Sequence, residues 1–163
     1  MLDLMEKRFE VNDVKNALFN CYDVGVHSPP LGFMVGMPGE TLKTCMESGK
    51  MMAEISAKIG VPPGLIFGMI DPYYAIPLVG TPLYEYGRQL GLIGQNEDEE
   101  EKYLELVSDV ASYKRYYINF NGSPMSEVIF WDMLVFLEAT RIYEKITKNK
   151  TTSKEWEKKL KIA

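Results

Sequence analysis

An apolar run that leads directly into a glycine-containing turn constrains this chain more than any other feature. Residues 31–36 carry no polar alternation, which is typical of a strand buried on both faces in a parallel sheet. Met37-Pro38-Gly39-Glu40-Thr41 forms the turn, and a helix that ends at Gly60 is predicted to follow. One face of that helix is small or apolar: Leu42, Cys45, Met46, Gly49, Met52, Ala53 and Ser56. A buried strand joined in this way to an amphipathic helix predicts α/β architecture.

A helix before this unit and a strand after it are also predicted. Asn12-Asp13 offers an N-cap for a helix that ends near Gly25, with apolar residues at helical spacing: Val14, Ala17, Leu18, Cys21 and Tyr22. A second apolar run, residues 65–70, predicts the second strand. The order helix, strand, helix, strand indicates parallel strands, although two strands do not complete a sheet.

The rest of the chain is predicted to be helical. Residues 83–90 form a short helix that stops at Gly91, and the acidic run of residues 97–101 opens another, where negative charge favours the helix dipole. A long helix begins at Ser126-Glu127, with one face formed by Ile129, Met133, Phe136, Leu137, Thr140 and Tyr143. The tail from Arg141 carries eight Lys and Arg against three Asp and Glu. We interpret it as a surface helix, with contact to RNA or another acidic partner as the less favoured alternative.

Composition and charge exclude several classes of protein. The 163 residues fit one domain, or one domain with a helical appendage. A net charge of −5 argues against a nucleic-acid coat, because phosphate binding needs an excess of basic residues. The start of the chain has no apolar run typical of a signal peptide, and Asp71 and Asp132 interrupt the two most apolar stretches. We therefore expect a soluble, cytoplasmic protein without a membrane span.

The residues offer no self-contained catalytic centre. His27 is the single histidine, and a lone histidine is more often structural or exposed than catalytic. Cys21 and Cys45 fall on apolar helix faces, where a thiol usually serves as a small core residue. No common hydrolase, metalloprotease or phosphate-loop motif occurs. We assign no catalytic residue and no metal ligand.

Two turns are candidates for ligand contacts. Glycines in residues 36–41 let a ligand approach the backbone, beside free N–H groups at a helix start and at the carboxyl edge of a strand. That edge is where parallel α/β folds bind ligands, although a plain strand–helix corner explains the same residues. Residues 75–85 form the second turn, with Pro77 and Pro82 fixing the backbone around Gly80.

Together these two turns resemble the second half of a radical S-adenosylmethionine (SAM) barrel. Members of that superfamily often carry Gly-x-Pro-Gly-Glu-Thr after one strand, and Pro-x-x-Gly-Thr-Pro-Leu-Tyr-Glu with a following Gly-Leu-Ile after the next. The matching residues are Gly36, Pro38, Gly39, Glu40, Thr41, Pro77, Gly80, Thr81, Pro82, Leu83, Tyr84, Glu85, Gly91, Leu92 and Ile93. Residues 97–109, followed by Tyr117-Ile118-Asn119, are similar to the tails of cobalamin-binding members.

The resemblance implies a fold and a set of contacts. Residues 1–95 would be the C-terminal portion of a partial (β/α)6 TIM-like barrel, and residues 96–163 an α-helical extension. Met34 and Gly36 would flank the adenine of SAM, while Pro38, Gly39 and Glu40 would shape the turn. Pro77 and Leu78 would lie near the adenine or the substrate.

The chain departs from the superfamily in one decisive respect. The Cys-x-x-x-Cys-x-x-Cys loop that holds the [4Fe–4S] cluster is absent, and a four-iron cluster needs thiolate ligands. We therefore expect the chain to be inactive alone, Met1 to be an internal start, and the N-terminal half of the barrel or a partner subunit to supply the cluster. Cobalamin, if used, would be bound by a domain outside this chain, and the substrate stays open.

Two other interpretations remain. In the first, the chain is a non-catalytic interaction module built on a half-barrel with a basic helical tail. In the second, it is an unrelated small α/β protein. A barrel fragment predicts an exposed apolar sheet edge that needs a partner. An independent module predicts a soluble monomer that unfolds cooperatively.

Overall fold

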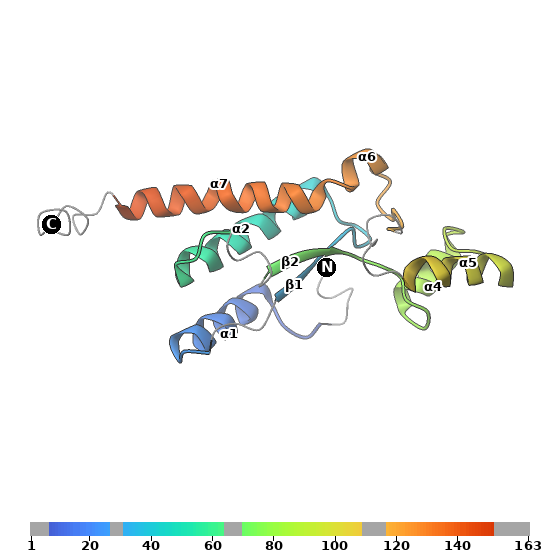
Figure 1. The fold of residues 1–163 in the computed structure, drawn as a ribbon, viewed down its shortest axis with the longest axis horizontal. Helices are drawn as coiled ribbons and strands as arrows, with labels where there is room; N and C mark the ends of the chain where they lie inside the picture. Colours follow the sequence, from blue (N-terminus) through green and yellow to red (C-terminus); the bar gives the residue numbers. More distant parts are fainter. Residues whose placement is uncertain (1–6, 27–30, 64–69, 109–116, 152–163) are drawn as a thin grey trace, which may run out of the picture.

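The fold is mostly helical, with two parallel strands, and is of α/β type. The computed structural model describes residues 7–26, 31–63, 70–108 and 117–151. Its elements, in chain order (Figure 1), are α1 (Val11–Asp23), β1 (Leu31–Val35), α2 (Leu42–Ile59), β2 (Ile70–Tyr74), α4 (Pro82–Gln89), α5 (Glu97–Ser108), α6 (Met125–Val128) and α7 (Trp131–Thr151).

β1 and β2 pair in parallel, with Leu31 opposite Ile70 and Val35 opposite Tyr74. Within the described residues this sheet has two strands, and no barrel is formed. Most of the run predicted as the second strand, residues 65–69, lies outside the described residues. β2 begins at Ile70 and continues through Asp71-Pro72, which the prediction missed because Asp and Pro are depleted in strands.

The sheet is covered on one face only by the described elements. Val35 and Tyr74 are buried in the core that also contains α2 and α7. Met34 and Tyr73, which are opposite one another in the register, are 45% and 49% exposed. The prediction that residues 31–36 are buried on both faces is therefore wrong: the run lacks polar alternation, but only alternate residues meet the helices.

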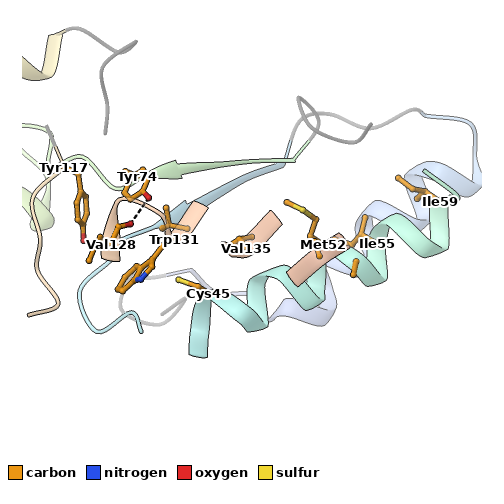
Figure 2. Packing of buried hydrophobic residues seen from close by; sticks show 12 residues of the cluster. Cys45, Met52, Ile55, Ile59, Tyr74, Tyr117, Val128, Trp131 and Val135 are labelled. Carbon is orange, nitrogen blue, oxygen red and sulfur yellow. Dashed lines mark hydrogen bonds between the residues drawn. The ribbon is translucent and has the colours of Figure 1, made fainter. Parts of the chain in front are cut away.

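α2 lies along α7 (Figure 1), and their contact forms the main core, whose buried side chains are shown in Figure 2. The helices approach most closely at Gly49, where an added Cβ would lie 2.6 Å from the carbonyl oxygen of Val135. The predicted limits of α2 are confirmed, because Thr41 caps the amide of Thr44 and Gly60 ends the helix with φ 76°. The buried cluster comprises Val35, Cys45, Met52, Ala53, Ile55, Ile59, Tyr74, Tyr117, Val128, Trp131, Val135 and Ala139.

The face predicted for the long C-terminal helix is wrong in its first turns, although Tyr143 of that face does pack against the core. The segment is broken into α6 and α7, and the residues of α7 that face α2 are Trp131, Val135, Glu138 and Ala139. Met133 and Leu137, which belong to the predicted face, are 50% and 54% exposed. Both faces of the helix are apolar in its first three turns, so helical spacing alone fits either of them.

The smaller helices agree with prediction more closely. α1 begins at Val11 with Glu10 as its cap rather than Asn12-Asp13, and Cys21 on it is only half-buried. α4 and the start of α5 lie where predicted, while the predicted end of α5 at Asp109 falls outside the described residues. A second cluster, formed by Tyr84, Ile93 and Tyr103, joins these two helices. None of the described helices combines the length and the apolar character that a membrane span requires.

Candidate ligand site at the carboxyl edge of the sheet

The residues predicted to contact a ligand gather around one edge of the sheet. β1 and β2 run in the same direction, so their carboxyl ends meet at the same edge, where the amide of Ala75 donates to the carbonyl of Val35 (2.9 Å). Residues 36–41 continue from β1 into α2, and residues 75–81 continue from β2 into α4. This edge is the candidate site.

Glu40 closes the turn that follows β1. Gly36 and Gly39 have φ of 84° and 82°, a region that glycine adopts without strain. The Glu40 carboxylate is buried, and its Oε2 accepts from the amides of Gly36 (2.5 Å) and Met37 (3.3 Å). Glu40 therefore holds the first two amides of the turn. Of the helix-start amides that were expected to be free for a ligand, that of Thr44 donates to Thr41 Oγ1 (3.3 Å).

Burial raises the pKa values of two side chains at this turn, those of Glu40 and Cys45. Desolvation raises the pKa of Glu40, and it outweighs the hydrogen bonds from Gly36, Cys45 and Met37 that favour the charged form. The Cys45 thiol donates to Glu40 Oε1 (3.5 Å), and burial together with the nearby carboxyl raises the pKa of that thiol well above its usual range. Cys45 is thus a protonated core residue, as predicted, and is not suited to be a nucleophile or a metal ligand.

Two residues of the helical extension, neither of them predicted to lie at the site, contact the same turn. The Tyr117 hydroxyl donates to the carbonyl of Gly36 (2.9 Å), and the Asn121 amide approaches the same oxygen (3.5 Å). Burial raises the pKa of Tyr117 to about 12, so the hydroxyl keeps its proton at neutral pH. The segment Tyr117-Ile118-Asn119 drew attention for its resemblance alone, and its contact with the turn was not predicted because 81 positions separate Tyr117 from Gly36.

The other predicted contact residues differ in their exposure. Met34 and Leu78 are 45% and 54% exposed, and Gly39 has open space where a Cβ would stand. Pro77 is buried, and its carbonyl accepts from the hydroxyl of Tyr103. Of the predicted contact residues, Met34, Gly39 and Leu78 are thus exposed, whereas Gly36, Glu40 and Pro77 are buried beneath the surface.

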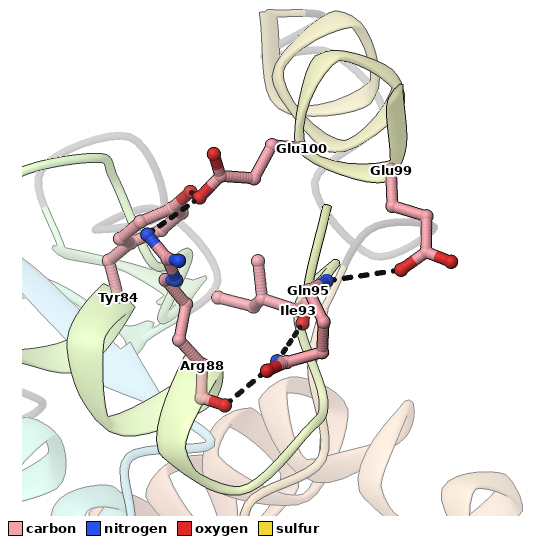
Figure 3. A network of polar contacts seen from close by, with 6 residues as sticks. All are labelled: Tyr84, Arg88, Ile93, Gln95, Glu99 and Glu100. Carbon is pink, nitrogen blue, oxygen red and sulfur yellow. Dashed lines mark hydrogen bonds and ion pairs between the residues drawn. The ribbon is translucent and has the colours of Figure 1, made fainter. Parts of the chain in front are cut away.

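A polar network behind the second turn joins α4 to α5 (Figure 3). The guanidinium of Arg88 and the hydroxyl of Tyr84 both bind Glu100 Oε1, at 2.9 and 2.5 Å. Gln95 bonds the carbonyls of Arg88 and Ile93 through its side chain. Every contact in this network joins groups of the chain itself, so it fixes the α4–α5 pair.

The described residues contain no group of three His, Cys, Asp or Glu side chains that could hold a metal ion. His27 and the basic tail beyond Thr151 lie outside the part of the chain that the structure describes. Comparison of the chain with protein-family models, with curated proteins and with solved structures gave no match.

Proposed function

We propose that this chain is the C-terminal part of a radical SAM enzyme and contributes contacts to the adenosyl group of SAM and to the substrate. The observation that carries the proposal is the turn of residues 36–41. It combines two glycines at positive φ, an internally bonded glutamate and a threonine cap, at the carboxyl edge of a parallel strand. The next strand leads to the second matching turn, where Thr81 caps α4 and Pro82 is its first residue.

The exposed residues of the edge suit a flat, weakly polar base. Met34 and Leu78 offer flexible apolar side chains, and Gly39 leaves room for close approach to the backbone. Glu40 would act indirectly, because both of its oxygens are already bonded within the turn. In this proposal the chain binds and orients the adenosyl group, and it excludes water from one side of it.

The cysteines of the chain do not fit a [4Fe–4S] cluster. Cys21 lies on α1 and Cys45 on α2, and the Cys45 thiol is fully buried and bonded to Glu40. A four-iron cluster that leaves one iron open for SAM needs three thiolates from one site. The cluster would therefore be held by the N-terminal half of the barrel or by a partner subunit.

The open sheet supports the need for such a partner. Among the described residues the sheet consists of β1 and β2 alone, whereas the proposed barrel has six strands, so the other strands would have to come from a partner. Met34 and Tyr73 would then be covered by the missing half.

Methyl resonances of methionine test the proposal on the chain itself. The protein is labelled at its ten methionine methyl groups, and Met34 is assigned with Met34→Leu. Titration with 5′-deoxyadenosine is expected to shift the Met34 resonance, because an adenine ring stacked on the thioether changes its magnetic environment. Met133, equally exposed on the outer face of α7, is the matched control and should not move.

Equal shifts at Met34 and Met133, or none at millimolar ligand, would contradict the proposal. A non-catalytic interaction module would then be favoured. The observation that supports this second candidate is a set of exposed apolar residues spaced three and four positions apart: Phe130 directly before α7, and Met133 and Leu137 on it.

A further inference from the structure

The carbonyl of Gly36 is held by the helical extension, not only by its own turn. Tyr117 donates to it at 2.9 Å, and Asn121 lies 3.5 Å from it and 3.3 Å from the Tyr117 hydroxyl. On the other side of the same residue, the Gly36 amide donates to Glu40. The first residue of the turn is thus fixed by its amide from within the turn and by its carbonyl from the extension.

The contact depends on glycine at position 36. A Cβ added there would lie 2.3 Å from the Tyr117 ring, so the ring occupies the space that a side chain would fill. Tyr117 is itself held, since its ring lies 5.2 Å from that of Tyr74, whose hydroxyl donates to the carbonyl of Val128 (2.7 Å). Figure 2 shows Tyr117 and Tyr74 side by side at this end of the core. Little freedom is left to either group.

The hydrogen bonds of the Asn121 side chain are poor for a residue whose role is to stabilise the fold. Its bonds to Gly36 and Tyr117 are long, and its buried Oδ1 has no hydrogen-bond partner among the described residues. An unpaired buried amide oxygen costs stability. An apolar residue would avoid that cost, so the amide is better explained by what it does to the Gly36 carbonyl.

We propose that Tyr117 and Asn121 are positioning residues that hold the Gly36 carbonyl, and with it residues 34–39, in the geometry that binds the adenosyl group. This inference rests on the proposed function. It makes the helical extension a working part of the ligand site: Met34 lies two residues before Gly36 and Gly39 three residues after it, so rotation of this peptide moves both.

Tyr117→Phe tests the role, because it removes the hydroxyl and keeps the ring against Gly36. The dissociation constant for 5′-deoxyadenosine, read from the Met34 methyl at a temperature where the chain is fully folded, should rise about 2- to 10-fold. Tyr22→Phe is the matched control. It removes another tyrosine hydroxyl that donates to a backbone carbonyl, that of Ile59 (2.8 Å), at the opposite end of α2. If Tyr117 contributed to stability alone, the dissociation constant of the fully folded chain would change in neither variant.

Asn121→Ala is the second variant and decides the matter if Tyr117→Phe does not fold; we expect a rise of about 2- to 3-fold. If the parent chain binds 5′-deoxyadenosine and a folded Tyr117→Phe or Asn121→Ala variant binds it with the same dissociation constant, the positioning role is overturned. The proposed function then stays intact. An equal loss in Tyr22→Phe also overturns the positioning role. A parent chain that shows no Met34 shift overturns the proposed function and this inference together.

Discussion

Gly36 is the residue on which the geometry of the site depends most. It adopts φ 84°, gives its amide to Glu40 and its carbonyl to Tyr117, and leaves room for the tyrosine ring. Gly39 shares the positive φ, at 82°, but a Cβ there would meet nothing within 4 Å. A side chain at position 39 would therefore cause backbone strain alone, whereas one at position 36 would cause both backbone strain and a steric clash.

Gly36→Ala should lower the free energy of unfolding by about 3 kcal/mol, since it adds overpacking against Tyr117 to the strain of a left-handed residue. Gly39→Ala carries only the strain and should cost about 1 kcal/mol. Urea unfolding followed by far-ultraviolet circular dichroism measures both. Equal losses would mean that Tyr117 moves aside freely and that its contact with Gly36 is weak.

Glu40 makes the stability of the chain depend on pH. Burial raises the pKa of its carboxyl above the usual 4.5, so the folded chain binds that proton more tightly than the unfolded chain does. The free energy of unfolding contributed by this group is highest below pH 4.5 and falls as pH rises through the folded-state pKa. Burial of the charged carboxylate is the physical cause.

Glu40→Gln should weaken this pH dependence, because an amide stays neutral and its oxygen still accepts from Gly36 and Met37. Urea midpoints measured from pH 4 to pH 8 give the result, with Glu47→Gln on the exposed side of α2 as the control. Glu40→Ala should instead lose about 2 kcal/mol or more at every pH, since two turn amides lose their acceptor. The same slope in Glu40→Gln and in the parent chain would argue against a raised pKa.

At the scale of elements, local signals determined what the sequence could predict. The limits of α2 follow from Thr41 and Gly60, which act on the backbone next to them. The turn at residues 36–41 was predicted for the same reason, from Pro38 and Gly39, whereas a part for Glu40 in it was implied only by the resemblance. Tyr117 could not be found in this way, because its contact with Gly36 arises only when distant elements pack.

α7 shows the opposite case, in which local pattern misleads. Its first turns are apolar on two faces, and the choice between them is made by the shape of α2, where Gly49 admits the backbone near Val135. Helical spacing cannot report that fit. The predicted face therefore included Met133 and Leu137, which are exposed, and left out Trp131 and Val135, which are fully buried.

Two adjacent aromatic residues test which face is buried. Trp131 is fully buried and Phe130 is 50% exposed. Trp131→Ala should lower the free energy of unfolding by about 3–5 kcal/mol, through lost burial and the cavity it leaves. Phe130→Ala should change it by no more than about 0.5 kcal/mol. Urea midpoints compared at constant m-value distinguish the two, and a larger loss at Phe130 would reverse the assignment of faces.

At the scale of the whole molecule, the extension and the strand–helix units share one core. Tyr117, Val128 and Trp131 belong to the same buried cluster as Val35 and Cys45. The buried face of α2 is covered mainly by α7, and the other face of the sheet stays open. Composition shifts near residue 96, but packing continues across that position.

Residues 1–95 alone are therefore expected to lack a cooperative fold. Trp131, Val135 and Ala139 cover Cys45 and Met52, which would face water without them. A two-stranded sheet whose helices have lost this cover is not expected to be stable. A peptide of residues 117–151, added in trans, should restore both helical circular dichroism and a sigmoidal urea transition, because it supplies that apolar face. The same peptide carrying Trp131→Ala is the control and should restore little. If residues 1–95 unfold cooperatively by themselves, the strand–helix units are an independent domain, and the contact of Tyr117 with Gly36 joins two separately stable parts.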